Sequence, residues 1–370
     1  MTEFLKKASW IELFYDLAYV ALVAQLTYLS VEHHDSLYDL LNIFIVGYSI
    51  FLAWWVTTAN RNLQDVETTT DKLLIQLKMV GAFLMSITMP AVFDGDYLGF
   101  FLTLALVRFV QIFMMLRLYR IHPEQAPVTY NMVQGLFIAG VLWAFSGFLA
   151  DPYHFVLAGM ALALDILTPL SVGKGNSIRM LNAYHLQERL GLFLMLVIGE
   201  SMIVVALSNS LALQTVTMPS IVFSGLILMV ALWWLYFEHL DECGVGARPQ
   251  NLFAYLHAHG LLYGSIILLS VAYKLFLTSS PTLPTYHFFI AGFVGLVITL
   301  CVIRWALHGW SPWAEPHLYE VGLLGIATIA YGYYSGAYLE SAVILSIVLA
   351  AAAFVDRRAQ AQLPSSAATP

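Results

Sequence analysis

The sequence predicts an all-α membrane protein, a polytopic helical bundle with about twelve transmembrane helices that form two parallel six-helix repeats. Three observations lead to this prediction. Of the 370 residues, 60% are hydrophobic and only 11% are charged, whereas a soluble domain carries about a quarter charged residues. The apolar residues form long continuous runs separated by short polar connections. The two halves of the chain also contain a Glu and a Trp pair at similar spacings.

This composition excludes several classes of protein. A soluble core stops growing near about 300 residues, so the apolar surplus must face lipid. We expect membrane lipid as a partner and no nucleic acid. A soluble enzyme and a disordered protein are excluded for the same reason, and no cofactor motif, catalytic residue set or metal-ligand spacing is present. We therefore do not expect this protein to be an enzyme, and we expect it to bind neither a metal ion nor a cofactor.

The spans can be justified in order along the chain. Each apolar run is close to the roughly 20 residues that cross a bilayer as a helix. The first run carries Glu12 and Asp16 and lacks the cleavage site of a signal peptide, so it is expected to stay as a span. Gly, Pro and acidic clusters separate the later runs. The predicted spans are 10–30, 38–59, 73–93, 97–119, 128–150, 153–172, 188–208, 219–238, 252–278, 285–307, 317–334 and 337–355.

The charges predict the orientation. Positive side chains are kept on the cytoplasmic side during insertion. With the N-terminus inside, the Lys and Arg residues between spans fall on the cytoplasmic side, and only Lys274 falls outside. We therefore expect a multi-pass membrane protein with both termini in the cytoplasm.

The repeat rests on spacing. Trp54 follows Glu12 by 42 residues, and Trp233 follows Glu188 by 45. Six helices is an even number, so the two halves would cross the membrane in the same direction. The predicted parts are a first repeat at 1–172, a cytoplasmic linker at 173–187, a second repeat at 188–356 and a disordered tail at 357–370.

Ionisable and polar side chains inside the spans are the candidate site, because each costs several kcal/mol in hydrocarbon unless it is paired or wetted. Glu12 and Asp16 share one helix face. Glu200 lies twelve residues after Glu188, roughly 18 Å along the helix and close to the bilayer centre. The candidate residues for binding a substrate or ion are Glu12, Asp16, Gln25, Lys78, Arg108, Asp165, Glu188, Glu200 and His257.

Each candidate also has a structural interpretation. The carboxylates of Glu12, Asp16, Asp165 and Glu188 could pair with Arg and Lys and hold helices together. The Trp54-Trp55 and Trp233-Trp234 pairs are typical of anchors at the membrane interface. His257 and His259 point to different helix faces, which argues against a shared metal site.

Several motifs resemble the bacterial low temperature requirement A family. The segment Glu12-Leu-Phe-Tyr-Asp16-Leu is similar to the family's opening motif, and Glu188-Arg-Leu-Gly-Leu-Phe with Gly199-Glu200-Ser201 is similar to a later one. Leu164-Asp165-Ile-Leu-Thr168-Pro169 and Trp233-Trp234-Leu-Tyr236-Phe also match. His257 fits a Tyr-x-His element, and His259 departs from the family pattern. The resemblance implies a multi-pass protein of the bacterial inner membrane that is linked to growth in the cold, and it brings no biochemical activity with it.

Three functions stay open. The first is a secondary transporter, coupled to protons or cations, whose Asp16 and Glu200 bind the ion while a small solute lies between the halves. The second is a membrane sensor or lipid-interacting scaffold whose buried charges are structural pairs. The third is an ion channel. The sequence leaves the substrate, the coupling ion and the oligomeric state undetermined.

Overall fold

A computed structural model describes residues 6–34, 36–64, 68–121, 123, 126–150, 152–168, 181–207, 217–242, 249–278, 282–308 and 316–361. These residues form twelve α-helices and no strand, which confirms the all-α prediction. Over the same residues, nine helices are long and apolar enough to cross a membrane. The chain is therefore a multi-pass helical membrane protein. Residues 173–180 of the predicted linker at 173–187 lie outside the described residues, and its last five residues, from Ala183, already belong to a helix.

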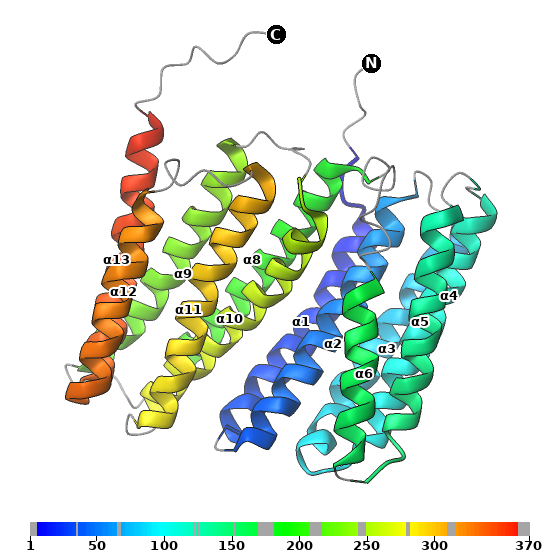
Figure 1. Ribbon diagram of the computed structural model, residues 1–370, viewed down its shortest axis with the longest axis horizontal. Coiled ribbons are helices and arrows are strands. Elements are labelled where there is room, and N and C mark those ends of the chain that lie inside the picture. The colour runs from blue at the N-terminus through cyan, green and yellow to red at the C-terminus, as the bar shows by residue number, and fades with distance from the viewer. Residues whose placement is uncertain are drawn as a thin grey trace. The chain divides into compact units, whose positions relative to one another are not determined.

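The helices follow the predicted runs closely (Figure 1). In the first half they are α1 (Trp10–Glu32), α2 (Leu37–Asn62), α3 (Thr69–Phe93), α4 (Leu98–Ile121), α5 (Ala126–Ser146) and α6 (Tyr153–Leu167). In the second half they are α8 (Ala183–Leu207), α9 (Thr217–Glu242), α10 (Leu252–Thr278), α11 (Leu283–His308), α12 (Pro316–Ser335) and α13 (Tyr338–Ala361).

Local sequence sets where the first helices begin. The α2 and α3 helices each start after a Ser or Thr whose side chain accepts from the amide of an Asp three residues later, as at Ser36 and Thr68. The Asp39 and Asp71 carboxylates in turn accept from the amides of those cap residues. This reciprocal capping satisfies amides that have no partner inside the helix. The turn between α3 and α4 contains Gly95 at φ +88°, a conformation that favours glycine.

The last helix extends further than the composition predicts. Its α-helical residues continue to Ala361, five residues into the segment 357–370 that we expected to be disordered. Ala, Arg and Gln are strong helix formers, which accounts for the extension. Residues 362–370 lie outside the described part.

The chain divides into two compact units. The first contains residues 1–197 and 246–264, and the second contains 198–245 and 265–370. Both units draw on α8 and α10. The predicted division into repeats at 1–172 and 188–356 stays a prediction.

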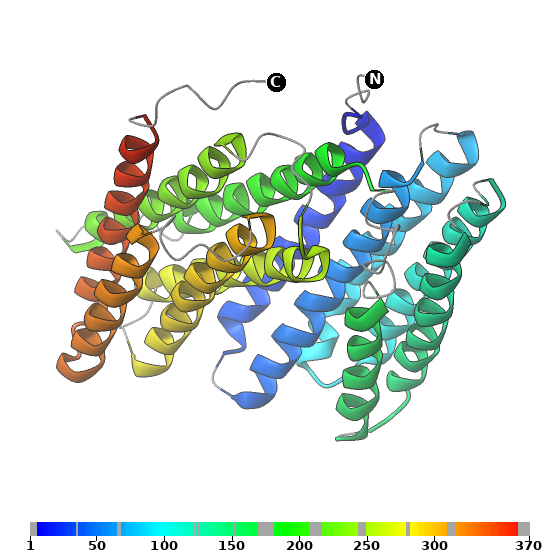
Figure 2. The ribbon, with the colours of Figure 1, turned by 45° about the horizontal axis from the view of Figure 1, so that its top comes forward.

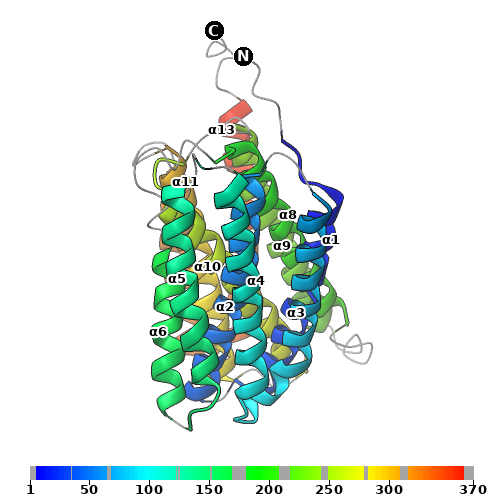
Figure 3. The ribbon, with the colours of Figure 1, turned by 90° about the vertical axis from the view of Figure 1, so that its right-hand side faces the viewer.

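In the first unit, α1 to α6 run alongside one another (Figures 1 and 2). Helix α4 packs against α3 and α5, and α5 packs against α6, as the side view also shows (Figure 3). Helix α2 contacts α1, α3, α4 and α6, so it lies centrally in this unit. Most of its residues from Asn42 to Asn62 are buried.

Helix α3 shows how the first unit sorts its side chains. One stripe of large apolar residues is exposed, from 49% at Leu77 to 61% at Phe83, and it suits a lipid-facing surface. The stripe comprises Leu73, Leu77, Val80, Phe83 and Ile87. The opposite face buries Lys78 and Asp71. This helix therefore turns its apolar side outward and places polar groups inside, the reverse of a soluble helix.

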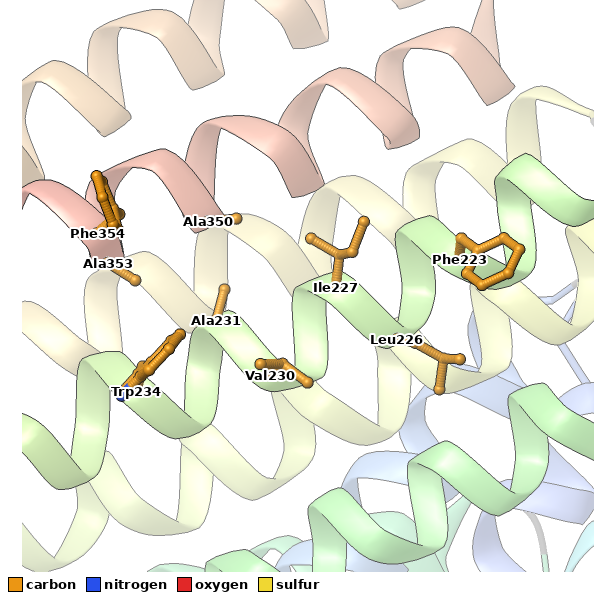
Figure 4. A pocket seen from close by; sticks show the side chains of 9 residues that line it. All are labelled: Phe223, Leu226, Ile227, Val230, Ala231, Trp234, Ala350, Ala353 and Phe354. Atoms are coloured by element: carbon orange, nitrogen blue, oxygen red, sulfur yellow. The ribbon is translucent and has the colours of Figure 1, made fainter.

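In the second unit, α9 packs against α13, and α12 packs against α13 and α11. A cavity of about 330 Å³ lies between α9 and α13 (Figure 4). Its lining residues are Phe223, Leu226, Ile227, Val230, Ala231, Trp234, Ala350, Ala353 and Phe354. This almost wholly apolar lining suits hydrocarbon and provides no group that could bind an ion.

Candidate functional site

The site begins with the acidic face of α1. Glu12 and Asp16 lie one helical turn apart, and both are buried. The Glu12 Oε2 atom accepts from the Ser9 amide and the Ser9 hydroxyl, at 2.9 Å each. Its Oε1 atom lies 3.1 Å from His185 Nε2 on α8. Glu12 therefore caps its own helix and contacts α8 through His185.

Asp16 forms a buried three-residue cluster, the Asp16 triad, with Trp54 and Arg189. The Arg189 guanidinium donates through Nη1 to Oδ2 at 2.7 Å and through Nη2 to Oδ1 at 2.6 Å. The Trp54 indole donates to Oδ1 at 2.7 Å. The guanidinium carbon also lies 5.7 Å from the centre of the Trp54 ring system. A bidentate pair with an added indole donor compensates both charges without water.

Asp165 forms a second cluster of the same composition, the Asp165 triad, with Arg108 and Trp143. Its Oδ2 atom accepts from Arg108 Nη2 at 2.7 Å and from the Trp143 indole at 2.9 Å. Arg108 Nη1 also donates to Gln111 Oε1 at 3.0 Å. Here the pair is monodentate, and Asp165 Oδ1 has no hydrogen-bond partner among the described residues.

The region between the triads centres on the backbone carbonyl of Ala53 on α2. Gln111 donates to this oxygen at 2.6 Å, and Lys78 Nζ lies 3.5 Å from it. The hydroxyls of Thr57 and Tyr15 lie 3.3 and 3.5 Å from the same oxygen. Side chains from α1, α2, α3 and α4 therefore meet at one buried point.

We refer to the two triads and the groups at this point as the polar network. Its members come from α1, α2, α3, α4, α5, α6 and α8, all within the first unit. They are Tyr15, Asp16, Trp54, Thr57, Lys78, Arg108, Gln111, Trp143, Asp165 and Arg189.

His257 borders the network. Its Nδ1 lies 2.6 Å from the Tyr48 hydroxyl on α2, and its Nε2 lies 3.2 Å from the carbonyl of Ile166 on α6, next to Asp165. His259 instead contacts the carbonyl of its own helix at Tyr255, at 2.7 Å. The two imidazoles therefore contact different backbone carbonyls, that of Ile166 and that of Tyr255. Among the described residues, no group of three or more His, Cys, Asp or Glu side chains is arranged to hold a metal ion.

The other candidates are not members of the polar network. Glu188 accepts from the Ala8 amide at 2.8 Å, so it ties the segment before α1 to α8. Gln25 and Glu200 are half-buried, and neither makes a hydrogen bond or ion pair with a described residue. Glu200 belongs to the second unit. The structure thus brings together Asp16, Lys78, Arg108 and Asp165, with His257 beside them.

Sequence reasoning missed three parts of the site. Arg189 was not a candidate, although it follows Glu188 directly. Trp54 was interpreted as an interface anchor, yet it is fully buried and donates to Asp16. Trp143 received no role. The sequence signal that could have pointed to these residues is the number of acidic and basic side chains inside the spans. Each buried carboxylate needs hydrogen-bond donors from elsewhere in the fold, and Arg and Trp can provide them.

Comparison with known proteins agrees with the motifs. A family model described as bacterial low temperature requirement A protein matches residues 7–355. An uncharacterized protein, RA0937, of Rhizobium meliloti (strain 1021) is 27% identical over 321 residues, which cover 81% of this chain and 76% of that protein. No solved structure matches. The triads and the polar network therefore belong to a multi-pass membrane protein of the bacterial low temperature requirement A family.

Proposed function

We propose that this protein is a secondary transporter that couples proton movement to the movement of a small solute across the bacterial inner membrane. It has both termini in the cytoplasm in this proposal, because the positive residues between spans then lie inside. The proposal assigns no chemical reaction to the protein. The observation that carries it is the polar network, in which buried polar side chains from seven helices, five of which contribute a charged residue, meet inside a membrane-spanning unit.

Such a concentration of buried charge is costly, so its presence favours a working role. A scaffold could use apolar packing between the same helices at less cost, because replacing buried ion pairs by apolar side chains is often neutral or stabilising. Two ion pairs next to a buried lysine instead resemble the charge relays of pumps and transporters.

A proton suits Asp16 better than a metal cation does. Both oxygens of this carboxylate already accept N–H donors from Arg189 and Trp54, at 2.6 to 2.7 Å. A cation would have to displace the guanidinium, whereas a proton cancels the negative charge and loosens the pair. Protonation of Asp16 would then free Arg189 to move, which is a two-state element of the kind that alternating access needs.

The second carboxylate in this proposal is Glu200. It makes no hydrogen bond or ion pair with any described residue, and it lies between Gly199 and Ser201. We propose that Glu200 takes up and releases the proton while the two predicted repeats rock against each other.

The proposal can be tested with purified protein in liposomes that contain a pH-sensitive dye. Four solutes of different charge are added outside: glycine, lactate, choline and glycerol. We expect at least one to drive a saturable proton flux that protein-free liposomes lack, and Asp16→Asn and Glu200→Gln to abolish it. Asp94→Asn is the matched control, because Asp94 is exposed at the end of α3 and should keep the flux. A flux that persists in both test variants would refute the mechanism.

A scaffold is the second candidate function. It is favoured by the complete pairing of Asp16, which leaves neither oxygen for a ligand. It predicts that none of the four solutes drives a proton flux. It also predicts that the swapped variant Asp16→Arg/Arg189→Asp folds as well as the natural chain, since only the charge balance would matter.

A further inference from the structure

Lys78 stands out among the buried charges. It is the tenth residue of α3, roughly 14 Å into the helix, and its side chain is fully buried. Its Nζ atom lies 3.5 Å from the Ala53 carbonyl and 5.2 Å from the centre of the Tyr15 ring. No carboxylate oxygen of the described residues lies within 4.0 Å of it. A buried lysine normally has an acidic partner, so this one lacks its counter-charge.

The rest of the network cannot provide that counter-charge. Asp16 is neutralised by Arg189, and Asp165 is neutralised by Arg108. A protonated Lys78 would therefore add one uncompensated positive charge to the interior of the first unit. The Arg108 guanidinium belongs to the same network and has the same sign of charge, so it offers no compensation either.

Hydrogen bonding shows the same imbalance. Four donor groups lie within 3.5 Å of the Ala53 oxygen, from Tyr15, Thr57, Lys78 and Gln111. A carbonyl oxygen has two lone pairs, so it can serve two of them well. Arg108 Nε nearby on α4 also has no acceptor among the described residues. The Tyr15 hydroxyl also lies 2.9 Å from that of Tyr19 and 2.8 Å from that of Thr57, and Gln111 occupies the Ala53 oxygen at 2.6 Å. Among the described residues Lys78 Nζ therefore has a single acceptor, shared and 3.5 Å away, although buried donors normally have an acceptor in native structures.

We infer that Lys78 binds an anionic group of a small solute, either a carboxylate or a small inorganic monoanion. This inference rests on the proposed transport function and names the class of substrate. The anion supplies a close acceptor for Nζ and the missing negative charge. In this proposal Lys78 is a neutral amine while the site is empty. When the anion binds, Nζ takes up a proton from solution, so the bound state contains an ammonium beside an anion and the network gains no net charge.

The surroundings of Nζ fit this exchange. Three helices pack against α3. Helix α1 contributes the phenol of Tyr15, and α2 contributes the carbonyl of Ala53 and the hydroxyl of Thr57. Helix α4 contributes the amide of Gln111, which Arg108 contacts in turn. None of these groups is acidic near neutral pH, so none competes with an incoming anion for the ammonium.

The experiment uses the full-length chain in detergent. Sodium chloride, nitrate, lactate and pyruvate are each compared with sodium gluconate, which is too large for a fully buried site, at equal ionic strength. The readouts are the unfolding midpoint temperature from tryptophan fluorescence and the proton uptake in weakly buffered solution. The variants are Lys78→Met, Lys78→Arg and the control Lys72→Met, because Lys72 lies on the same helix but is exposed.

We expect at least one anion to raise the midpoint temperature of the natural chain and of Lys72→Met by several degrees, and to leave Lys78→Met unchanged. Binding should take up about one proton per anion in the natural chain. Lys78→Arg should bind the anion without taking up a proton, because arginine stays protonated. Chloride and nitrate identify an inorganic ion, and lactate and pyruvate identify a carboxylate.

The inference is overturned if none of the four anions stabilises the natural chain beyond gluconate, or if Lys78→Met responds as the natural chain does. If Lys78→Met does not fold, the proton count of the natural chain against Lys78→Arg decides. Equilibrium binding requires no transport, so anion binding without flux would refute only the proposed function. Flux of choline or glycerol without anion binding would refute only this inference.

Discussion

The Asp16 triad allows a quantitative prediction about how the first unit is held together. Its carboxylate receives three N–H donors, two of them from Arg189, across 173 residues of sequence. Removing one partner of a buried ion pair costs about 3–5 kcal/mol, because the other charge stays buried without compensation. We expect Asp16→Asn to cost about 3 kcal/mol, since the amide keeps one acceptor oxygen, and Arg189→Met to cost about 4 kcal/mol.

The double variant Asp16→Asn/Arg189→Met removes both charges at once. Its loss of unfolding free energy should be smaller than the sum of the two single losses by about 2–3 kcal/mol. This coupling energy lies in the upper part of the range for residues in contact. The Asp165–Arg108 pair provides the comparison. It has a single N–H···O bond at 2.7 Å, and Arg108 also contacts Gln111. We expect a coupling of about 1 kcal/mol for Asp165→Asn/Arg108→Met.

The assay is reversible unfolding in mixed detergent micelles with increasing sodium dodecyl sulfate. Tryptophan fluorescence reports the transition, because Trp54 and Trp143 each lie in a triad. A complete double-mutant cycle is measured for each pair. A coupling below about 0.5 kcal/mol for Asp16 with Arg189, or one smaller than that of the Asp165 pair, would refute the argument from bidentate geometry.

Two further predictions use matched neighbours. Trp54→Phe removes the indole donor to the buried carboxylate and should cost about 1.5–3 kcal/mol, whereas Trp55→Phe removes an indole nitrogen that has no partner among the described residues and should cost much less. Equal losses in urea or detergent unfolding would show that ring volume dominates. Gly260→Ala places a methyl group about 2.5 Å from the Phe51 ring and should cost about 1–3 kcal/mol, whereas Gly264→Ala meets no atom within 4 Å and should be neutral or stabilising. Thermal unfolding of both variants checks this, and a stable Gly260→Ala would contradict the close contact between the Phe51 ring and Gly260.

The sequence by itself determined the helices and the residues that needed explanation. Continuous apolar runs of spanning length can form only helices in lipid, so twelve helices followed from local composition. Motifs such as Glu12-Leu-Phe-Tyr-Asp16 also identified the family, which the family model confirms. The cost of a buried charge is a property of the single residue, and for that reason Asp16, Lys78, Arg108 and Asp165 could be selected without a structure.

Only the tertiary structure decided which groups compensate each charge. Arg189 reaches Asp16 from a helix 173 residues away, and no local pattern encodes that pairing. Trp54 fits an interface anchor by its place at the end of a run, yet packing of α2 at the centre of the first unit buries it and turns its indole toward Asp16. The lack of an acid near Lys78 is likewise a fact about neighbours from α1, α2 and α4. Partner choice depends on how helices pack, and packing brings together residues whose separation in sequence carries no information about their contact.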